Sequence, residues 1–395
     1  MQWLGGSGAL GLESVSAGDS SLADAGSGVF AARDLASGER FLAVPHSACL
    51  AVEDGPLGPG AELAAALLRE RSRGAASPLA PYVASLPSAR DLASHPLLWP
   101  AEVRPRTLLG SSPQALRMVR HMQMRAAAEA EELVRAGVAR TLSEARWALA
   151  IVESRAVTLG DGSAGAPERL ALCPLVDLLN HEVPPAGEPS SCLFMDAPQH
   201  GMVALSTDRP VRRSEELCLV YESCSTAQIF ARYGFVQQLP AGEGCLLEVP
   251  LGDPRLPGGP EARALRLDFV RRAGWRRSAW KDLLLRLPEN ARAEGALLSV
   301  ARLAVLPDAD ALRRLGRGAF NGGGLEPELE ARARAQAGLW VEAALTRVDA
   351  GAARLEGAPG APAGGPEIRR AALGLLRIER GVLERSAEIL AAALP

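Results

Sequence analysis

The order of strand-like and helix-like segments is the feature that most constrains the fold of this 395-residue chain. Short apolar runs separated by turn residues fill 29–45 and 170–236, whereas 61–156 and most of the chain beyond 249 are rich in the residues that favour helices. A doubly wound sheet would instead alternate strands with helices along its whole length. The pattern therefore predicts an α+β fold, in which a β-rich domain with a helical insert is followed by an all-α C-terminal domain.

Individual elements can be predicted inside these blocks. The segments 29–33 and 40–45 flank a polar turn that contains glycine, which is the pattern typical of a β-hairpin. Further short strands are expected at 193–195, 202–205, 217–220 and 246–249. Helices are expected at 61–71, 113–136, 143–156 and 367–393. The low-complexity stretch 357–366 is expected to be a flexible loop.

Charge and hydropathy disfavour several classes of protein. The formal net charge is −3 and no basic face is evident in the sequence, so nucleic acid is not the expected partner. No apolar run is long enough to cross a bilayer, and the N-terminus has no basic stretch before its short apolar patch. We therefore expect an intracellular protein without a membrane anchor.

Cysteine and histidine spacing argues against a metal centre. The 6 cysteines include no C-x-x-C pair, and the 5 histidines have no metal-ligand spacing. Reduced and mostly buried thiols are therefore expected. The sequence also contains no G-x-S-x-G, no P-loop and no recognisable pair of catalytic carboxylates.

The first candidate site is the glycine-rich loop at Gly26, Ser27 and Gly28. Its G-x-G-x-x-A pattern loosely matches dinucleotide-binding loops, but those need a preceding strand and a following helix. Here polar, turn-like residues precede the glycines and a hairpin is expected to follow, so a dinucleotide fold is disfavoured. The glycines allow either a close approach of the backbone to a ligand or a plain tight turn.

The second candidate site is the end of the apolar run 172–181, where Asp177, Asn180 and His181 place three polar groups close together. Adjacent Asn and His side chains cannot share one face of a strand, so a joint role would also use backbone groups. A capped turn is the alternative interpretation, because Asn and Asp favour turns.

The remaining candidates are two tyrosines and an arginine. Tyr221 and Tyr233 lie twelve residues apart in a chain that has only 3 tyrosines. Arg155 occupies the apolar end of a predicted helix. Taken singly, the tyrosines could be half-buried packing residues and the arginine a surface residue.

In this order and spacing, the segments resemble the SET-domain protein methyltransferases, specifically the group that includes the Rubisco large-subunit lysine methyltransferase and the actin-histidine methyltransferase. The helical tail is similar to the substrate-binding domain of that group in character and length. The segments that carry the resemblance are Met1 to Leu4, the Gly26 loop with Ala31 to Leu35, Ser154 to Ala156, Val176 to His181, and Tyr221 to Phe235.

The resemblance implies a SET domain at 1–237, with its helical insert at about 56–142, and a helical substrate-binding-type domain at 238–395. It implies S-adenosylmethionine as the methyl donor and a protein substrate that docks on the helical domain of a monomer. The residues implied to hold the cofactor are Ala25, Gly26, Ser27, Asn180 and His181. The residues implied on the substrate side are Arg155, Asp177, Tyr221 and Tyr233, with Tyr221 at the reactive centre.

The chain departs from the family pattern at three places. Ala25 replaces a frequent acidic residue, the usual Ser-Asn-Ala-Glu reads Ser-Thr-Ala-Gln at 225–228, and Cys192 lies near the position of a further substrate-side tyrosine. Protein-lysine N-methylation is the expected activity. Protein-histidine N-methylation and a catalytically inactive binding module are the alternatives.

Overall fold

The computed structural model divides the chain into two compact units. The first contains Met1–Ala101, Met118–Cys224 and Gln228–Pro240, and the second contains Glu102–Arg117, Ser225–Ala227 and Ala241–Pro395. The described residues are 2–22, 25–160, 167–184, 187–197, 200–221, 225–236, 245–272, 283–287, 291–321, 325–357 and 365–392.

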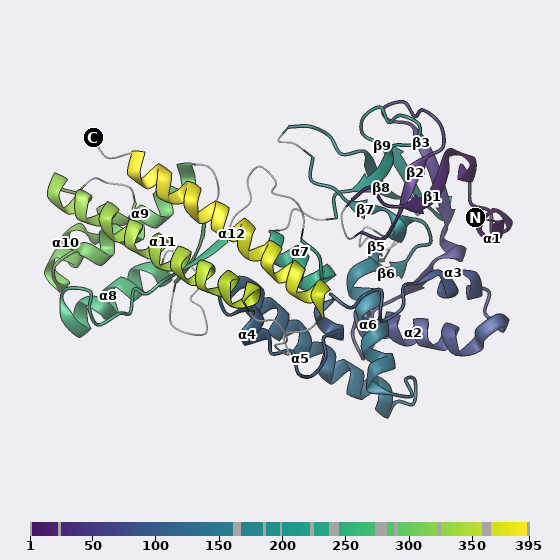
Figure 1. The fold of residues 1–395 in the computed structure, drawn as a ribbon, viewed down its shortest axis with the longest axis horizontal. Helices are drawn as coiled ribbons and strands as arrows, with labels where there is room; N and C mark the ends of the chain where they lie inside the picture. Colours follow the sequence, from purple (N-terminus) through teal and green to yellow (C-terminus); the bar gives the residue numbers. More distant parts are fainter. Residues whose placement is uncertain are drawn as a thin grey trace. The chain divides into compact units, whose positions relative to one another are not determined.

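Most strands of the described residues belong to the first unit (Figure 1). They are β1 (Val15–Asp19), β2 (Ser27–Ala31), β3 (Arg40–Pro45), β4 (Leu50–Val52), β5 (Val157–Leu159), β6 (Arg169–Leu172), β7 (Asn180–His181), β8 (Cys192–Ala197), β9 (Met202–Thr207) and β10 (Glu216–Leu219). The main sheet has the order β1-β2-β10-β8-β9-β3, with β7 beside β10, and a small sheet has the order β4-β6-β5. This sheet-and-helix unit, followed by a mostly helical one, confirms the predicted α+β class.

The predicted hairpin of 29–33 with 40–45 is wrong, although both strands form. β2 pairs with β1 and β10, whereas β3 pairs with β9 at the far end of the sheet order. The connection between β2 and β3 is much longer than the two-residue turn of a tight hairpin. Within it, Leu35 forms its own bridge to Val211. The hairpin partner of β2 is instead β1, whose last residues had the composition of a turn.

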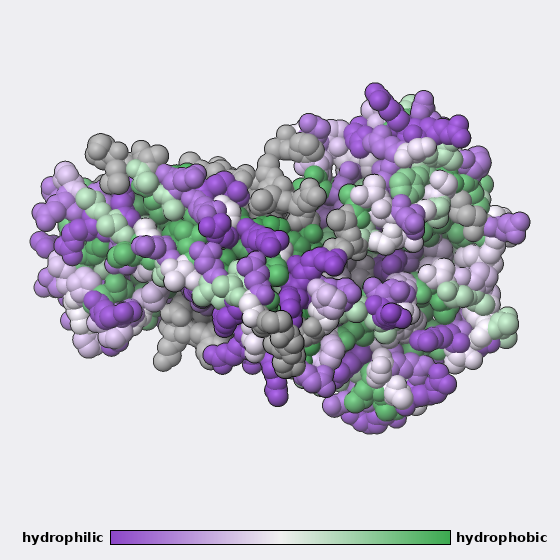
Figure 2. All heavy atoms as spheres, viewed as in Figure 1, coloured by the Kyte–Doolittle hydropathy of each residue, from purple (hydrophilic) through white to green (hydrophobic). Residues whose placement is uncertain are grey.

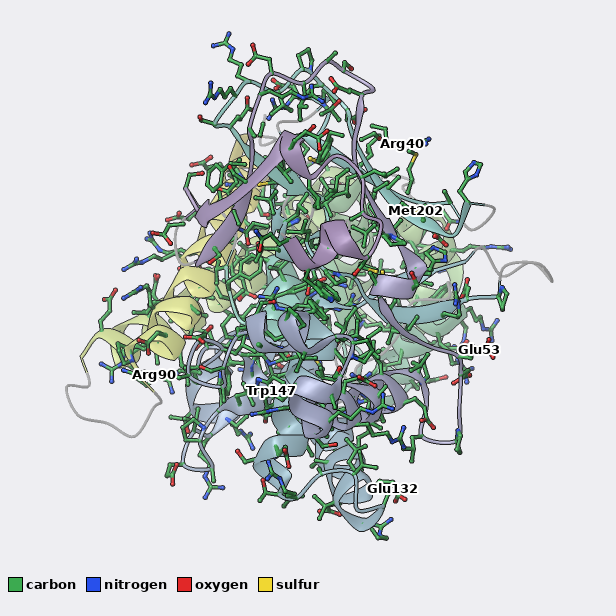
Figure 3. All side chains as sticks on the ribbon, turned by 90° about the vertical axis from the view of Figure 1, so that its right-hand side faces the viewer. Arg40, Glu53, Arg90, Glu132, Trp147 and Met202 are labelled. Carbon is green, nitrogen blue, oxygen red and sulfur yellow. The ribbon has the colours of Figure 1, made fainter. Side chains whose placement is uncertain are left out.

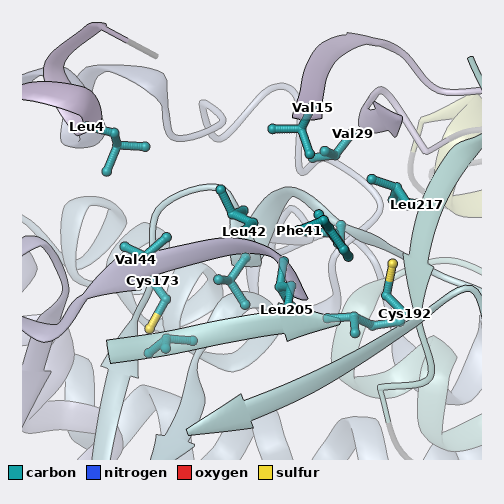
Figure 4. Packing of buried hydrophobic residues seen from close by; sticks show 14 of the residues in the cluster. Leu4, Val15, Val29, Phe41, Leu42, Val44, Cys173, Cys192, Leu205 and Leu217 are labelled. Carbon is teal, nitrogen blue, oxygen red and sulfur yellow. The ribbon is translucent and has the colours of Figure 1, made fainter. Parts of the chain in front are cut away.

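A hydrophobic core fills the interior of the first unit and fixes which faces of the strands point inward. Val29 on β2 lies opposite Leu217 on β10, and both side chains are buried. At the connection between β2 and β3 the chain carries exposed charged residues, and Figure 2 shows mostly hydrophilic atoms there. Figure 4 shows the packing of Leu4, Val15, Val29, Phe41, Leu42, Val44, Cys173, Cys192, Leu205 and Leu217.

The predicted helices are present within a few residues of their expected limits. In α6, the Thr141 side chain accepts a hydrogen bond from the Glu144 backbone N–H, the usual N-cap arrangement, and the helix ends at Arg155. The helices outside the tail are α1 (Gln2–Gly6), α2 (Pro59–Arg73), α3 (Ala80–Ser85), α4 (Pro105–Leu109), α5 (Pro113–Arg135), α6 (Leu142–Arg155) and α7 (Thr226–Tyr233).

The second unit is mostly helical beyond its first strand. Its β11 (Cys245–Val249) pairs with β12 (Leu283–Leu287), so the expectation of helix alone after 249 is wrong at that strand. Its helices in the tail are α8 (Gly259–Arg272), α9 (Ala291–Val305), α10 (Ala309–Phe320), α11 (Pro327–Glu356) and α12 (Pro366–Ala392). The expected loop at 357–366 lies largely outside the described residues. None of the described helices is long and apolar enough to span a membrane.

Candidate active site

The glycine-rich loop closes the hairpin of β1 and β2. Gly18 lies opposite Gly28 in the ladder, and the Ser20 N–H donates to the Gly26 carbonyl over 2.7 Å. Gly26 has a φ of 72°, a left-handed conformation that glycine adopts without the steric cost of a side chain. No atom would lie within 4 Å of a Cβ added there, so the outer side of the loop is open.

Glu216 fixes this loop from the neighbouring strand. Its carboxylate accepts hydrogen bonds from the Ser20 hydroxyl over 2.7 Å and from the Ser21 N–H and hydroxyl over 2.8 and 2.6 Å. A Cβ on Gly28 would overlap a Glu216 carboxylate oxygen and lie 3.1 Å from the Asn180 Nδ2. Gly28 therefore allows β2 to lie close to the Glu216 and Asn180 side chains. A glycine that served only in a plain turn would not need this close approach.

The ionisation of Glu216 reflects these contacts. Burial alone would raise the pKa of its carboxyl, but the hydrogen bonds from Ser21, Asn180 and Ser20 outweigh burial and lower the pKa below its ordinary value. The carboxylate is thus held in its charged form as an acceptor for the loop.

The Asn-His segment meets the loop because β7 runs parallel to β10. Asn180 lies opposite Cys218 and His181 opposite Leu219. The Asn180 Nδ2 donates to the Ser27 carbonyl over 3.1 Å and to Glu216 over 2.9 Å. Two segments more than 150 residues apart in sequence are thereby joined by direct hydrogen bonds. Of the five predicted cofactor-side residues, Asn180 and Ser27 are joined directly by this bond, while Ala25 and Gly26 precede Ser27 in the loop and His181 follows Asn180 in β7.

Tyr221 lies just beyond β10 and contacts the same segment. Its hydroxyl donates to the Leu179 carbonyl over 2.8 Å, and its backbone N–H donates to the His181 Nδ1 over 3.2 Å. The rings of Tyr221 and His181 have centroids 5.1 Å apart, and those of Tyr221 and Tyr233 are 4.9 Å apart. Phe235 adds a further ring, 5.9 Å from Tyr233.

An aromatic cluster is thus formed by His181, Tyr221, Tyr233 and Phe235, in which Tyr221 packs against the rings of His181 and Tyr233. Burial raises the pKa of Tyr221 well above its ordinary value, although the nearby Arg155 charge acts in the opposite direction. Tyr221 therefore stays a neutral phenol at physiological pH, able to donate one hydrogen bond and accept others.

Asp177 and Arg155 form a second contact group beside the cluster. Asp177 lies in η5 (Val176–Leu178), a 3-10 turn, and the Arg155 Nη1 donates to its carbonyl over 2.7 Å. The same nitrogen is 3.9 Å from the Asp177 carboxylate, which also accepts a hydrogen bond from the Tyr82 hydroxyl at 2.6 Å. The Arg155 Nε is buried with no protein acceptor in the described residues. Arg155 is thus not a plain surface arginine.

Tyr233 is held by a close approach between α7 and the helical insert. Gly234, which follows α7, has a φ of 79°, and a Cβ there would lie 2.6 Å from the His95 Cα. The His95 Nε2 donates to the Arg232 carbonyl over 2.9 Å, while its Nδ1 accepts from the Leu97 N–H over 3.2 Å. This arrangement explains the glycine in the Tyr-Gly-Phe segment.

Sequence reasoning missed three residues of this region: Tyr82, His95 and Glu216. Tyr82 carried a usable signal, because it is the third of only 3 tyrosines and the other two were already candidates. No comparable signal in the sequence marked Glu216 or His95. The role of Glu216 depends on strand pairing and that of His95 on backbone packing. Cys192, the departure from the family pattern, is a core residue, and burial raises the pKa of its thiol to about 12.

A separate cavity lies in the helical part of this unit. A cavity of about 910 Å³ is bordered by residues of α2, α3 and α6, among them Arg71 and Trp147, whose guanidinium carbon and ring centroid are 4.2 Å apart. It includes none of the predicted site residues. In Figure 3, Trp147 lies among the helices, away from Arg40 and Met202 on the main sheet. Within the described residues, no cluster of His, Cys, Asp and Glu is arranged to hold a metal ion.

Comparison with solved structures places this geometry on a known fold. The SET domain of LSMT bound to lysine and AdoHcy matches with a TM-score of 0.64 and 19% identity, over 99% of this chain and 90% of that one. The chain has the SET-domain fold of LSMT. Rubisco LSMT bound to AdoMet, and the same enzyme bound to sinefungin and monomethyllysine, match with TM-scores of 0.64, 20% identity and the same coverage. No protein-family model and no curated protein sequence matches the chain.

Proposed function

We propose that this chain is an S-adenosylmethionine-dependent protein-lysine N-methyltransferase. The observation that carries the proposal is that Asn180 is hydrogen-bonded to Ser27 while Tyr221 contacts His181, so the cofactor-side and acceptor-side candidates adjoin one another. The similar folds are of proteins bound to AdoMet, AdoHcy, lysine and monomethyllysine. The SET-domain resemblance of the sequence supports the same activity.

The residues of the loop fit a cofactor of this kind. Gly26 leaves open space on its outer side, Ser27 is exposed, and Asn180 is partly exposed at the start of β7, where it is followed by the buried His181. Ala25, Gly26, Ser27, Asn180 and His181 would hold the cofactor mainly through hydrogen bonds. S-adenosylmethionine supplies a methyl group on a positively charged sulfonium, which is ready for in-line transfer to a nucleophile.

Tyr221 would orient the acceptor nitrogen. Since its hydroxyl proton is donated to the Leu179 carbonyl, the oxygen lone pairs remain available to accept an N–H from an amine. Such a bond would aim the nitrogen lone pair toward the methyl group, and positioning of this kind supplies much of the rate enhancement of a displacement. Arg155, Asp177 and Tyr233 would complete the substrate side.

The aromatic cluster would also help to deprotonate a lysine. A free lysine side chain has a pKa of about 10.4, so bringing it to the neutral form at pH 7.4 costs about 4 kcal/mol. Burial of the amine in this partly apolar site, beside the cationic sulfonium, would disfavour the ammonium form and reduce this cost, with the proton lost to water. No acid-base pair is required for this chemistry.

We assign catalysis and substrate docking to the two domains expected from the sequence. Residues 1–237 would act as the SET domain, with the insert at about 56–142, and residues 238–395 would dock the protein substrate. We propose that the chain acts as a monomer.

A labelling experiment tests the proposed activity. The purified chain is incubated with tritiated S-adenosylmethionine and a protein lysate, and the labelled proteins are hydrolysed to amino acids. The Lys281→Arg variant is a useful control, because Lys281 is the only lysine of the chain and its removal abolishes lysine self-labelling. Tritium in methyl-lysine of lysate proteins is expected for both. Tritium in methyl-histidine instead would make imidazole the acceptor. Absence of protein label, with S-adenosylhomocysteine still bound by calorimetry, would contradict methyl transfer and favour a binding module.

A further inference from the structure

Tyr82 is a buried residue of the helical insert that the proposed chemistry leaves without a role. It is the buried side chain of the short helix α3, and its ring is only 4% exposed. Its hydroxyl donates to the Asp177 Oδ2 over 2.6 Å, across 95 positions of sequence. A phenol directed at a buried carboxylate is a specific contact, since a phenylalanine would pack the same space without the hydrogen bond.

Asp177 is held from two elements at once. The Tyr82 hydroxyl binds its carboxylate, and Arg155 at the end of α6 binds its carbonyl over 2.7 Å. The turn η5 that contains Asp177 is entered through Leu175, whose φ of 67° is a left-handed conformation that is unfavourable for a side-chain-bearing residue. A turn with this strain needs contacts that hold it, and the bonds from Tyr82 and Arg155 are such contacts.

The turn leads directly to the groups that touch Tyr221. Two residues after Asp177, the Leu179 carbonyl accepts the Tyr221 hydroxyl over 2.8 Å, and β7 begins at the next residue. A change in the position of Asp177 would therefore move the acceptor of the Tyr221 hydroxyl. It would have less effect on Ser27 and Glu216, which fix Asn180 through separate bonds.

We infer that Tyr82 is a positioning residue for methyl transfer, which orients Tyr221 through Asp177, η5 and the Leu179 carbonyl. The inference rests on the proposed function. The helical insert would then help to position Tyr221, in addition to any docking of the substrate by the second unit.

The pKa of Asp177 can show whether Tyr82 acts through this carboxylate, because a Tyr82 that only filled space would not affect that pKa. Burial raises the pKa of Asp177, while the Arg155 charge and the Tyr82 hydrogen bond lower it. Cys173 and Tyr221 are further titratable groups near it. The hydrogen bond with Cys49 and burial raise the pKa of Cys173, and burial raises the pKa of Tyr221, so both stay protonated. Removing the Tyr82 hydroxyl therefore raises the pKa of Asp177 further, since its strongest neutral donor is lost.

The test compares wild type with Tyr82→Phe in the tritium assay, with the amount of lysate protein varied and rates expressed per S-adenosylhomocysteine site counted by calorimetry. We expect kcat to fall about tenfold, which corresponds to about 1.4 kcal/mol in the activation free energy, because η5 loses one of the two contacts that hold it. The affinity for S-adenosylhomocysteine should be unchanged. The acid-side inflection in the pH profile of kcat/KM should move to higher pH.

Two further variants make the result decisive. Ser85→Ala removes another hydroxyl of α3, one bonded only to the Tyr82 backbone carbonyl at 2.7 Å, and should leave kcat and the pH profile as in wild type. In Asp177→Asn, which cannot titrate, the added Tyr82→Phe change should no longer move the inflection. A Tyr82→Phe enzyme with wild-type kcat and an unmoved inflection would overturn the inference alone. A wild-type chain that binds S-adenosylhomocysteine but transfers no tritium would instead overturn the proposed function, and this inference with it.

Discussion

Tyr221 has the side chain on which the proposed chemistry depends most. Its hydroxyl bonds the Leu179 carbonyl at 2.8 Å, and its backbone bonds His181, so both its position and its hydrogen-bonding direction are fixed. Its ring packs against Tyr233 in the aromatic cluster. A phenylalanine at this position keeps these ring contacts and loses only the hydroxyl. The variant therefore tests the orientation of the acceptor separately from packing.

For Tyr221→Phe we predict that kcat in the tritium assay falls about a hundredfold, the loss typical of a misplaced reacting group. The affinity for S-adenosylhomocysteine by calorimetry should change little, because the cofactor-side groups are on the loop and β7. The same variant with undiminished turnover would show that the hydroxyl has no role in the reaction.

Gly28 tests the close approach of the loop to β10. A Cβ at this position overlaps the Glu216 carboxylate, whereas Gly60 at the start of α2 has no atom within 4 Å of an added Cβ. We predict that Gly28→Ala lowers the affinity for S-adenosylhomocysteine and destabilises the fold by about 1–3 kcal/mol, the usual cost of overpacking. Gly60→Ala serves as the matched control and should preserve affinity. Equal calorimetric affinities for the two variants would argue against a cofactor role for the loop.

At the scale of elements, His95 joins the helical insert to the end of α7. The side chain is fully buried, and burial lowers its pKa from 6.5 to about 4 despite the hydrogen bond to the Arg232 carbonyl. The folded protein therefore binds this proton less readily than the unfolded chain does. The resulting stability is fully present above pH 6.5 and is lost as the pH falls from 6.5 toward 4.

The corresponding prediction is a loss of about 3 kcal/mol in the free energy of unfolding across that pH window, at about 1.4 kcal/mol per pKa unit. His95→Gln retains an amide that can donate to the Arg232 carbonyl but cannot titrate. Its urea midpoint should therefore depend less on pH between 6.5 and 4 than that of wild type. Parallel pH curves for the two proteins would mean that another group causes the acid loss.

The helices and strands also show which features local sequence patterns can predict. Helix-favouring composition predicted α2 and α5 well, and helical spacing predicted α6 and α12, because each of these helices is at least 14 residues long. The pairing of β2 with β1 and β10, and not with β3, was not predictable from composition. It depends on which strands share the buried core, such as Val29 with Leu217.

The candidate site was predictable only in part for the same reason. Family resemblance selected Ser27, Asn180 and Tyr221, and the structure brings these residues into one unit. Glu216 became visible only through the strand register, which places it opposite Phe30 with its carboxylate against Gly28. Neither periodicity nor motif spacing encodes such contacts across the sheet.

At the scale of the whole molecule, the fold is that of the LSMT structures although about four residues in five differ. Conservation of a fold at this identity does not by itself transfer an activity. The proposal therefore depends on the specific contacts of the site: the loop bonded to Asn180, and Tyr221 beside His181.

The most direct test of this account is a crystal structure of the chain with S-adenosylhomocysteine. We predict that the ligand contacts the Gly26–Ser27 loop and the Asn180–His181 segment, with its sulfur facing Tyr221. A ligand bound elsewhere in the molecule, with Tyr221 remote from its sulfur, would contradict the central claim.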